Sequence, residues 1–235
     1  MSRSVEAKTT LIEILELSRK YNLSYIDFFS LFIGSYGHTL HLLSKIRRDI
    51  AENIVAKIRK LTGMVIKSPD TLSTLRNRAL QLKYKGYQPF LVDCLGLPEV
   101  YEIYKRITDA CGHLSVVVEP YVNVTGLTYR FRSTFQASSM LELARMLSTS
   151  LYGSIDLVVH NELSNPLELD VLIKHADAKL RVYVDELARD AMSKHNAFIV
   201  SDHGYDLYHT NGKYYLDHGG DSKLAKIAPL IIVNC

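Results

Sequence analysis

The sequence is short of cysteine and has no long apolar run, and both shortages exclude classes of protein. Its three cysteines, Cys94, Cys111 and Cys235, form no CxxC pair, which argues against a structural zinc ribbon. Their odd number is typical of a reducing compartment. No apolar run reaches the ~18 residues of a membrane span, and the first ten residues lack the apolar stretch of a signal peptide. We therefore expect a cytoplasmic protein with no membrane partner.

The sequence also lacks a strong excess of charge, since its formal net charge is only +3. This value neither requires nor excludes a nucleic-acid partner, because a dedicated duplex binder usually has a stronger basic bias on one face. Hydrophobic residues make up 47% and charged residues 23% of the 235 residues, which argues against disorder and allows one sizeable domain.

Apolar residues at helical spacing dominate the sequence as far as Tyr84. Helices are predicted over residues 10–20, 25–43, 47–62 and 70–84. The pattern changes at Gly86, where short apolar runs begin to alternate with amphipathic segments. We therefore predict an N-terminal helical segment, residues 1–85, that packs on an α/β domain formed by residues 86–235.

The alternation after Gly86 predicts the fold class. Strands are predicted at residues 89–93, 114–118, 155–159, 197–200 and 227–233, and helices at 99–110, 140–147 and 167–193. Strands that alternate with helices favour an α/β fold in which a mostly parallel sheet is sandwiched by helices. In such sheets functional groups gather beyond the carboxyl ends of the strands, where both Asp93 and Asp202 are expected.

Aspartate or histidine stands close to glycine in three segments, residues 91–96, 198–204 and 216–220. Glycine lets the backbone turn tightly and approach a ligand closely. Carboxylate and imidazole together form a ligand set for zinc, manganese or iron. A single strand-terminal aspartate is often only a turn cap, but the joint pattern favours a metal site built from Asp93, Asp202, His203 and His218.

These motifs resemble the PglZ domain, a branch of the alkaline phosphatase superfamily, over residues 89–233. Phe90-Leu-Val-Asp93 resembles the first metal-binding aspartate of the family, and Ile199-Val-Ser-Asp-His-Gly-Tyr205 resembles its Asp-His-Gly signature. His218-Gly-Gly-Asp-Ser222 resembles the closing His-Gly-Gly-x-Ser motif, which the final strand follows. His160-Asn161 resembles the preceding His-Asn pair. The resemblance implies an alkaline-phosphatase-like fold.

The resemblance also implies a mechanism in which two zinc or manganese ions, about 4 Å apart, clamp a phosphoryl group that a hydroxyl attacks. The nucleophile aligns with Thr125, and Thr128 is the second choice; the alternative is that both threonines only satisfy turn hydrogen bonds. Arg130, His160 and Asn161 are expected to contact the substrate, although an exposed arginine is more often solvated.

The ligand assignment follows the same resemblance. Asp93, Asp202, His203 and Thr125 belong to one metal, and His218 belongs to the other. The sequence departs from the family at Ser164, where an aspartate ligand of the second metal is expected. Three alternatives stay open: Glu162 replaces that ligand, Asp170 or His175 supplies the missing donor, or the second site is weak or empty.

Three functions follow from this reading. The first is a metal-dependent phosphodiesterase with a threonine nucleophile, acting on nucleotides or nucleic acid in the phage-defence and signalling settings of the family. The second is a catalytically impaired metal-binding or regulatory module on the same fold. The third is a helical interaction protein that forms a homodimer through residues 1–85; the alternative for these helices is that they cover one face of the sheet.

Overall fold

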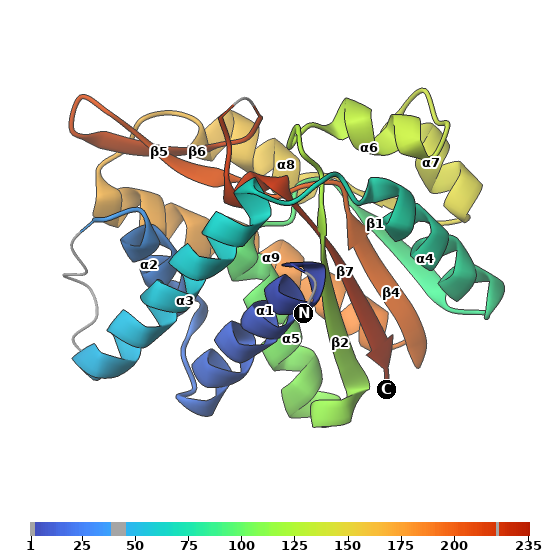
Figure 1. Ribbon diagram of the computed structural model, residues 1–235, viewed down its shortest axis with the longest axis horizontal. Coiled ribbons are helices and arrows are strands. Elements are labelled where there is room, and N and C mark those ends of the chain that lie inside the picture. The colour runs from blue at the N-terminus through green and yellow to red at the C-terminus, as the bar shows by residue number, and fades with distance from the viewer. Residues whose placement is uncertain (1–2, 39–45, 220) are drawn as a thin grey trace.

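A five-stranded sheet separates two layers of helices in this mixed α/β protein (Figure 1). The computed structural model describes residues 3–38, 46–219 and 221–235. The sheet has the order β2-β7-β4-β1-β3. Its strands are β1 (Gln88–Val92), β2 (Val116–Val122), β3 (Leu151–Tyr152), β4 (Asn196–Ser201) and β7 (Ile227–Asn234).

The sheet is mixed. Strand β1 pairs in parallel with β3 and β4, whereas β7 is antiparallel to both of its neighbours, β4 and β2. Four strands therefore run in one direction and only β7 runs against them. Their carboxyl ends meet at a single edge of the sheet, and β7 begins at that edge.

Helices cover both faces of the sheet, as expected. One layer contains α1 (Arg3–Lys20), α2 (Tyr25–Ser35), α3 (Arg48–Ile66), α5 (Leu97–Cys111) and α9 (Leu169–Met192). The other contains α4 (Leu72–Tyr84), α6 (Thr128–Thr134) and α7 (Met140–Leu147). Strand side chains alternate between the layers: Phe90 and Val92 join one hydrophobic cluster and Leu91 joins the other. This double burial explains why the strands read as continuous apolar runs.

Helices α1, α2 and α3 share one hydrophobic cluster with the sheet, whereas α4 belongs to the cluster on the opposite face. Leu11, Phe28 and Ile58 belong to the same cluster as the strand residues Val118 and Ile231. The division of the chain at residue 85 stays a prediction. Helix α2 ends at Ser35, and the last part of the helix predicted to reach residue 43 lies outside the described residues.

The prediction of a strand at residues 155–159 is wrong. This stretch forms the short helix α8 (Ser154–Val158) and a π-helical turn, η2 (Val159–Leu163), while the edge strand β3 lies just before it. A short aliphatic run does not distinguish a strand from a buried helix by its periodicity, and here the helix is the outcome. The helical form places Asp156 and His160 one turn apart.

A β-hairpin lies between the predicted Asp-His-Gly and His-Gly-Gly motifs. Strands β5 (Asp206–Thr210) and β6 (Lys213–Asp217) pair antiparallel through a turn at Asn211 and Gly212, both with positive φ. Asn-Gly favours this turn geometry. Across the described parts of the chain, no helix combines the length and the apolar character that crossing a membrane requires.

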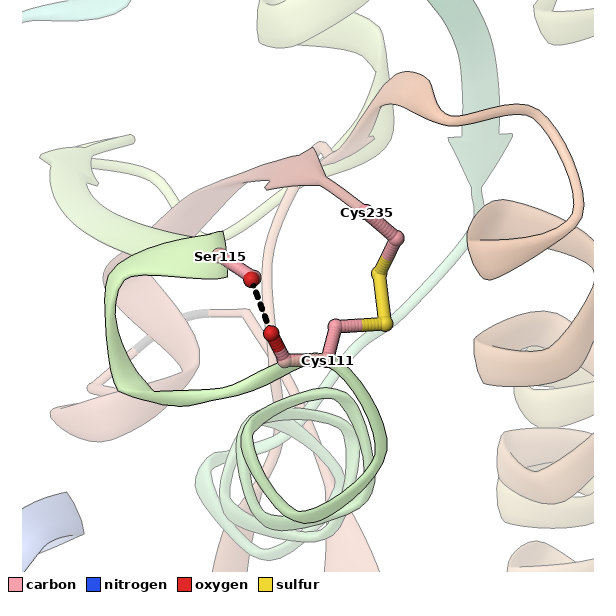
Figure 2. Close-up of a disulfide and its surroundings, with 3 residues drawn as sticks. All are labelled: Cys111, Ser115 and Cys235. Carbon is pink, nitrogen blue, oxygen red and sulfur yellow. Dashed lines mark hydrogen bonds between the residues drawn. A yellow bond between two sulfur atoms is a disulfide. The ribbon is translucent and has the colours of Figure 1, made fainter.

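A disulfide joins Cys111 at the end of α5 to Cys235 just after β7 (Figure 2). Their Cα atoms lie 5.4 Å apart although the residues are separated by 124 positions. Ser115 Oγ donates to the Cys111 carbonyl at 2.6 Å, which fixes the chain next to the bond. The pairing differs from the reduced state expected from the odd number of cysteines, because spacing alone does not reveal which cysteines meet. Cys94 remains a buried free thiol.

Glu99 is a fully buried carboxylate in the first turn of α5. Its Oε1 accepts hydrogen bonds from the hydroxyls of Tyr25 and Tyr205, the latter at 2.7 Å. Burial raises the pKa of Glu99 above its usual value, and the two phenol hydrogen bonds only partly oppose that rise. The folded protein therefore binds a proton at Glu99 more tightly than the unfolded chain does.

Removing the disulfide should destabilise the protein. Cys111→Ser or Cys235→Ser is expected to lower the unfolding free energy by about 2–4 kcal/mol, because the bond closes a long loop in the unfolded chain. Urea unfolding measures the loss, and adding a reductant to the double variant should change nothing further. Thiol titration of the unreduced, denatured protein should find one free thiol, and three thiols would contradict the pairing.

The buried Glu99 should make stability depend on pH in a defined direction. Because its folded pKa is raised, its contribution is complete below the unfolded pKa of about 4.3 and is lost as pH rises through the folded pKa. Glu99→Gln, which keeps an acceptor for the tyrosines, should therefore gain stability relative to the wild type as pH increases. Urea unfolding from pH 4 to 8 tests this; parallel pH profiles for the two proteins would contradict it.

Candidate metal centre

The predicted ligands meet at the sheet edge where β1, β2, β3 and β4 end. Asp93 directly follows β1, and Asp202 with His203 follows β4. Asp156 lies in α8, just after β3, and His218 comes from the end of β6. Adjacent parallel strands end at the same edge of the sheet, so residues that follow them lie close together in space although they are far apart in the sequence.

The first ligand group consists of Asp93, Asp202 and His203, whose ligand atoms all lie within 4.8 Å of one another. The side chains of Asp202 and His203 are fully buried. The Cys94 N–H donates to Asp202 Oδ1 at 3.1 Å, and the Leu95 N–H donates to the His203 carbonyl at 2.8 Å. These two bonds hold the turn after β1 against the turn after β4.

His203 presents the lone pair of its second ring nitrogen, Nε2, to the candidate ligand group. Its Nδ1 lies 2.9 Å from the Gly204 carbonyl, which assigns the proton to Nδ1 because a carbonyl can only accept. Burial lowers the pKa of His203 and favours the neutral ring, although the Asp202 charge opposes this. The unprotonated Nε2 then faces Asp202 Oδ2 at 3.1 Å. A carbonyl that orients a ligand imidazole in this way is usual in metal sites.

The second group consists of Asp156, His160 and His218. His160 Nε2 lies 3.2 Å from Asp156 Oδ1 and 2.8 Å from His218 Nε2, so three donor atoms converge. Asp156 and His160 share one side of the helical segment because they are four residues apart. The rings of His218 and His203 have centroids 4.1 Å apart, so the two groups are adjacent.

Negative charge is concentrated between the two groups. Burial, followed by the charges of Asp202 and Asp156, raises the pKa of Asp93 to about 8. Burial lowers the pKa of His218, but its hydrogen bond to Asp156 and the charge of that carboxylate outweigh this, so the net shift is upward. Carboxylates forced together in this way favour either protonation or a cation.

Several buried polar atoms of the site have no hydrogen-bond partner. They are Asp93 Oδ1, Asp202 Oδ2 and His218 Nδ1. A buried polar atom without a partner is costly, and that cost disappears when the atom binds a cation. Mixed carboxylate and imidazole donors suit zinc, manganese or iron, so the residues present fit a divalent metal in both groups.

The two candidate threonines have different surroundings. Thr125 Oγ1 donates to Asn123 Oδ1 at 2.8 Å and accepts from the Leu127 N–H at 3.3 Å, so it serves the turn. Thr128, at the first residue of α6, places its Oγ1 3.0 Å from His203 Nε2. The geometry therefore favours Thr128, the second choice from sequence, as the hydroxyl that faces the ligand groups.

Asn123 is a fully buried residue that the sequence did not single out. Its side-chain amide donates to the carbonyls of Asp202 and Leu127, each at 3.0 Å. It thus joins the loop that carries Thr128 to the strand end that carries the first ligand group. Its place directly after β2 gave no signal in the sequence, because the strand predicted there ended at residue 118 and the observed strand ends at Val122.

The remaining predicted residues lie outside both ligand groups within the described chain. Glu162, proposed as a substitute ligand, forms an ion pair with Lys179 at 3.3 Å, and Ser164 donates to the His160 carbonyl. Arg130 forms an ion pair with Asp70 at 3.1 Å. Further members of the predicted set, Asn161, Asp170 and His175, also lie outside the two groups, which leaves Asp156 as the carboxylate of the second group.

Comparisons with known proteins add no family assignment. Neither a scan against protein-family models nor a search of curated proteins finds a match for this chain. The resemblance to the PglZ domain therefore depends on the sequence motifs alone, and the functional reading depends on the geometry of the two ligand groups.

Proposed function

We propose that the protein is a metal-dependent phosphodiesterase that binds two divalent ions, zinc or manganese. The observation that supports this most directly is the pair of adjacent three-residue ligand groups, linked by the contact between His203 and His218. Two closely spaced metal sites are a recurrent arrangement for phosphoryl transfer. The alkaline-phosphatase-like fold belongs to the same proposal, with the donors at the ends of the strands.

Each metal has its own residues in this proposal. Asp93, Asp202 and His203 hold the first ion, and a second group of Asp156, His160 and His218 holds the other. When bound, the ions supply positive charge that stabilises the oxygens entering and leaving at phosphorus. Asp156 takes the part that the family pattern assigns to the position of Ser164.

Thr128 is the nucleophile in this proposal. Its hydroxyl loses its proton to solvent, and its Oγ1 forms a bond to phosphorus while the bond to the leaving oxygen breaks. The leaving oxygen takes a proton from water and departs as an alcohol. Water then attacks the phosphothreonine, which returns the threonine hydroxyl and releases a phosphomonoester. Asn123 holds the Thr128 loop in place throughout, through its bonds to Leu127 and Asp202.

The charge of the site favours a diester over a monoester. The three carboxylates offset most of the charge of two dications and leave one net positive charge, which matches a singly charged phosphodiester. Within the described chain, only histidines lie within ion-pair distance of Asp156 and Asp202, and Arg130 pairs with Asp70. The second negative charge of a monoester would find no basic partner among these pairs.

A nucleotide or nucleic acid is the substrate class we propose. Tyr129 follows Thr128 directly in α6 and is 52% exposed, so an exposed aromatic ring lies next to the proposed nucleophile in the chain. Base stacking on such a ring is tolerant of sequence and contributes about 1–3 kcal/mol per base. The modest net charge of the chain is compatible with a small nucleotide ligand.

Metal stoichiometry is the first test. Full-length protein stripped of metal should bind two zinc or manganese ions per chain, and Asp93→Asn and Asp156→Asn should each remove one, because Asp93 is one of the two carboxylates of the first group and Asp156 is the carboxylate of the second. Equilibrium dialysis with metal analysis measures this. Glu162→Gln is the matched control and should still bind two ions, since Glu162 pairs with Lys179. An Asp156→Asn variant that binds two ions as tightly as the wild type would contradict the assignment.

Hydrolysis of bis(p-nitrophenyl) phosphate tests the nucleophile. Thr128→Ala should lower kcat by on the order of 10³-fold or more, as deletion of a nucleophile does, while Thr128→Ser should retain measurable turnover. Thr125→Ala should have the smaller effect because that hydroxyl serves the turn. The reverse order of the two alanine variants would identify Thr125 as the nucleophile. A metal-loaded wild type inactive on all diesters would favour the non-catalytic module.

A further inference from the structure

Helix α2 places a tyrosine hydroxyl against a buried carboxylate at each of its ends. Tyr25 is its first residue, and its hydroxyl donates to Glu99. Tyr36 follows its last residue, and its hydroxyl donates to Asp206. Glu99 and Asp206 are 0% and 2% exposed, and neither belongs to a ligand group. Two buried acids thus connect the N-terminal helices to the motifs of the metal centre.

Glu99 reaches the first ligand group through Tyr205. The Tyr205 hydroxyl donates to Glu99 Oε1 at 2.7 Å, and Tyr205 lies two residues after His203. The Tyr205 ring packs on Gly96, where an added Cβ would lie 2.4 Å from the ring. Gly204 also packs closely on this turn, since an added Cβ would lie 3.2 Å from the Gly96 Cα. Tyr205 therefore presses the turn after β4 onto the turn after β1, and the ligands of the first group come from these two turns.

Asp206 holds the segment that carries His218 from both sides. In the β5–β6 hairpin it lies opposite Asp217, the residue directly before His218. Its carboxylate accepts hydrogen bonds from the backbone N–H groups of Lys223, Leu224 and Ala225 at 2.5, 2.9 and 3.2 Å. Asp206 therefore contacts the chain on both sides of His218: its backbone pairs with Asp217 before it, and its carboxylate binds the N–H groups after it.

We infer that Tyr25 with Glu99, and Tyr36 with Asp206, are positioning pairs that set the geometry of the first and the second ligand group respectively. The inference rests on the proposed two-metal function and assigns part of it to α2, which lies outside the segment that resembles the PglZ domain. The N-terminal helical segment is then part of the scaffold of the metal centre.

The physical reason lies in the cost of an unsatisfied buried carboxylate. Glu99 Oε2 has no hydrogen-bond partner, so the carboxylate depends on the tyrosine hydroxyls at Oε1. Without the Tyr25 hydroxyl, the carboxylate loses one of its two phenol donors and must shift towards other donors, and Tyr205 moves with it. Residues that orient metal ligands typically change metal affinity by about 10- to 100-fold when they are mutated.

Two tyrosine variants test the inference site by site, with the full chain and zinc as the probe. Tyr25→Phe in the Asp156→Asn background isolates the first group and should weaken zinc binding about 10- to 100-fold. Tyr36→Phe in the Asp93→Asn background isolates the second group and should weaken it by a similar factor. Each variant in the opposite background should bind zinc with unchanged affinity.

Tyr101→Phe is the matched control. Its buried hydroxyl donates to the Leu23 carbonyl at 2.8 Å, so the variant removes a phenol hydrogen bond from the same helical layer without touching Glu99 or Asp206. It should lower the melting temperature but leave both zinc affinities unchanged. Glu99→Gln, which keeps an acceptor for the tyrosines, should retain more affinity at the first group than Glu99→Leu.

The outcomes separate this inference from the proposed reaction. Wild-type affinities at both groups in the Tyr25→Phe and Tyr36→Phe variants would overturn the inference, as would an equal loss in Tyr101→Phe. A wild type that binds two zinc ions without hydrolysing any diester would overturn the reaction, while the affinities would still decide the inference. A wild type that binds no zinc would overturn both.

Discussion

Three aspartate carboxylates are held close together at one edge of the sheet, and much of the surrounding structure is organised around that concentration of charge. Burial raises the pKa of Asp93, and the negative charges of Asp202 and Asp156 raise it further. Without a cation this arrangement is unfavourable, because desolvation and mutual repulsion act in the same direction. The fold therefore stabilises, through its backbone bonds, a geometry that its own charges oppose.

Stability for this geometry comes from hydrogen bonds that uncharged amide N–H groups donate. The N–H groups of Cys94 and Leu95 fix the first group, and three successive N–H groups after residue 222 fix Asp206 next to the second. Asn123 adds side-chain bonds to two carbonyls. Such bonds cost little when no metal is bound, and they hold the candidate ligands in the arrangement that the proposed two-metal site requires.

The sequence singled out the candidate ligands at the ends of strands, but it missed Asp156 in α8 and assigned His160 to the substrate. Asp93, Asp202 and His203 stand directly after apolar runs, which is where a parallel sheet concentrates functional groups. Asp156 was missed because residues 155–159 resemble a strand. A strand would place residues four positions apart about 13 Å from each other, too far to share a cation, whereas a helix places them on adjacent turns. Thr125 and Thr128 differ only in their tertiary surroundings, which no local pattern contains.

The role that we infer for α2 could not be predicted from the sequence, because it also depends on tertiary contacts. Tyr25 and Glu99 are 74 residues apart, and Tyr36 and Asp206 are 170 apart, so their pairing is a property of the folded chain. A tyrosine in an apolar helix predicts only burial, and burial then demands a partner for its hydroxyl. Here both partners are acids adjoining the metal motifs. On our inference, the geometry of motifs that are short in the sequence is therefore set by a distant helix, α2. The proposed chemistry of the site then depends on how the N-terminal helices pack.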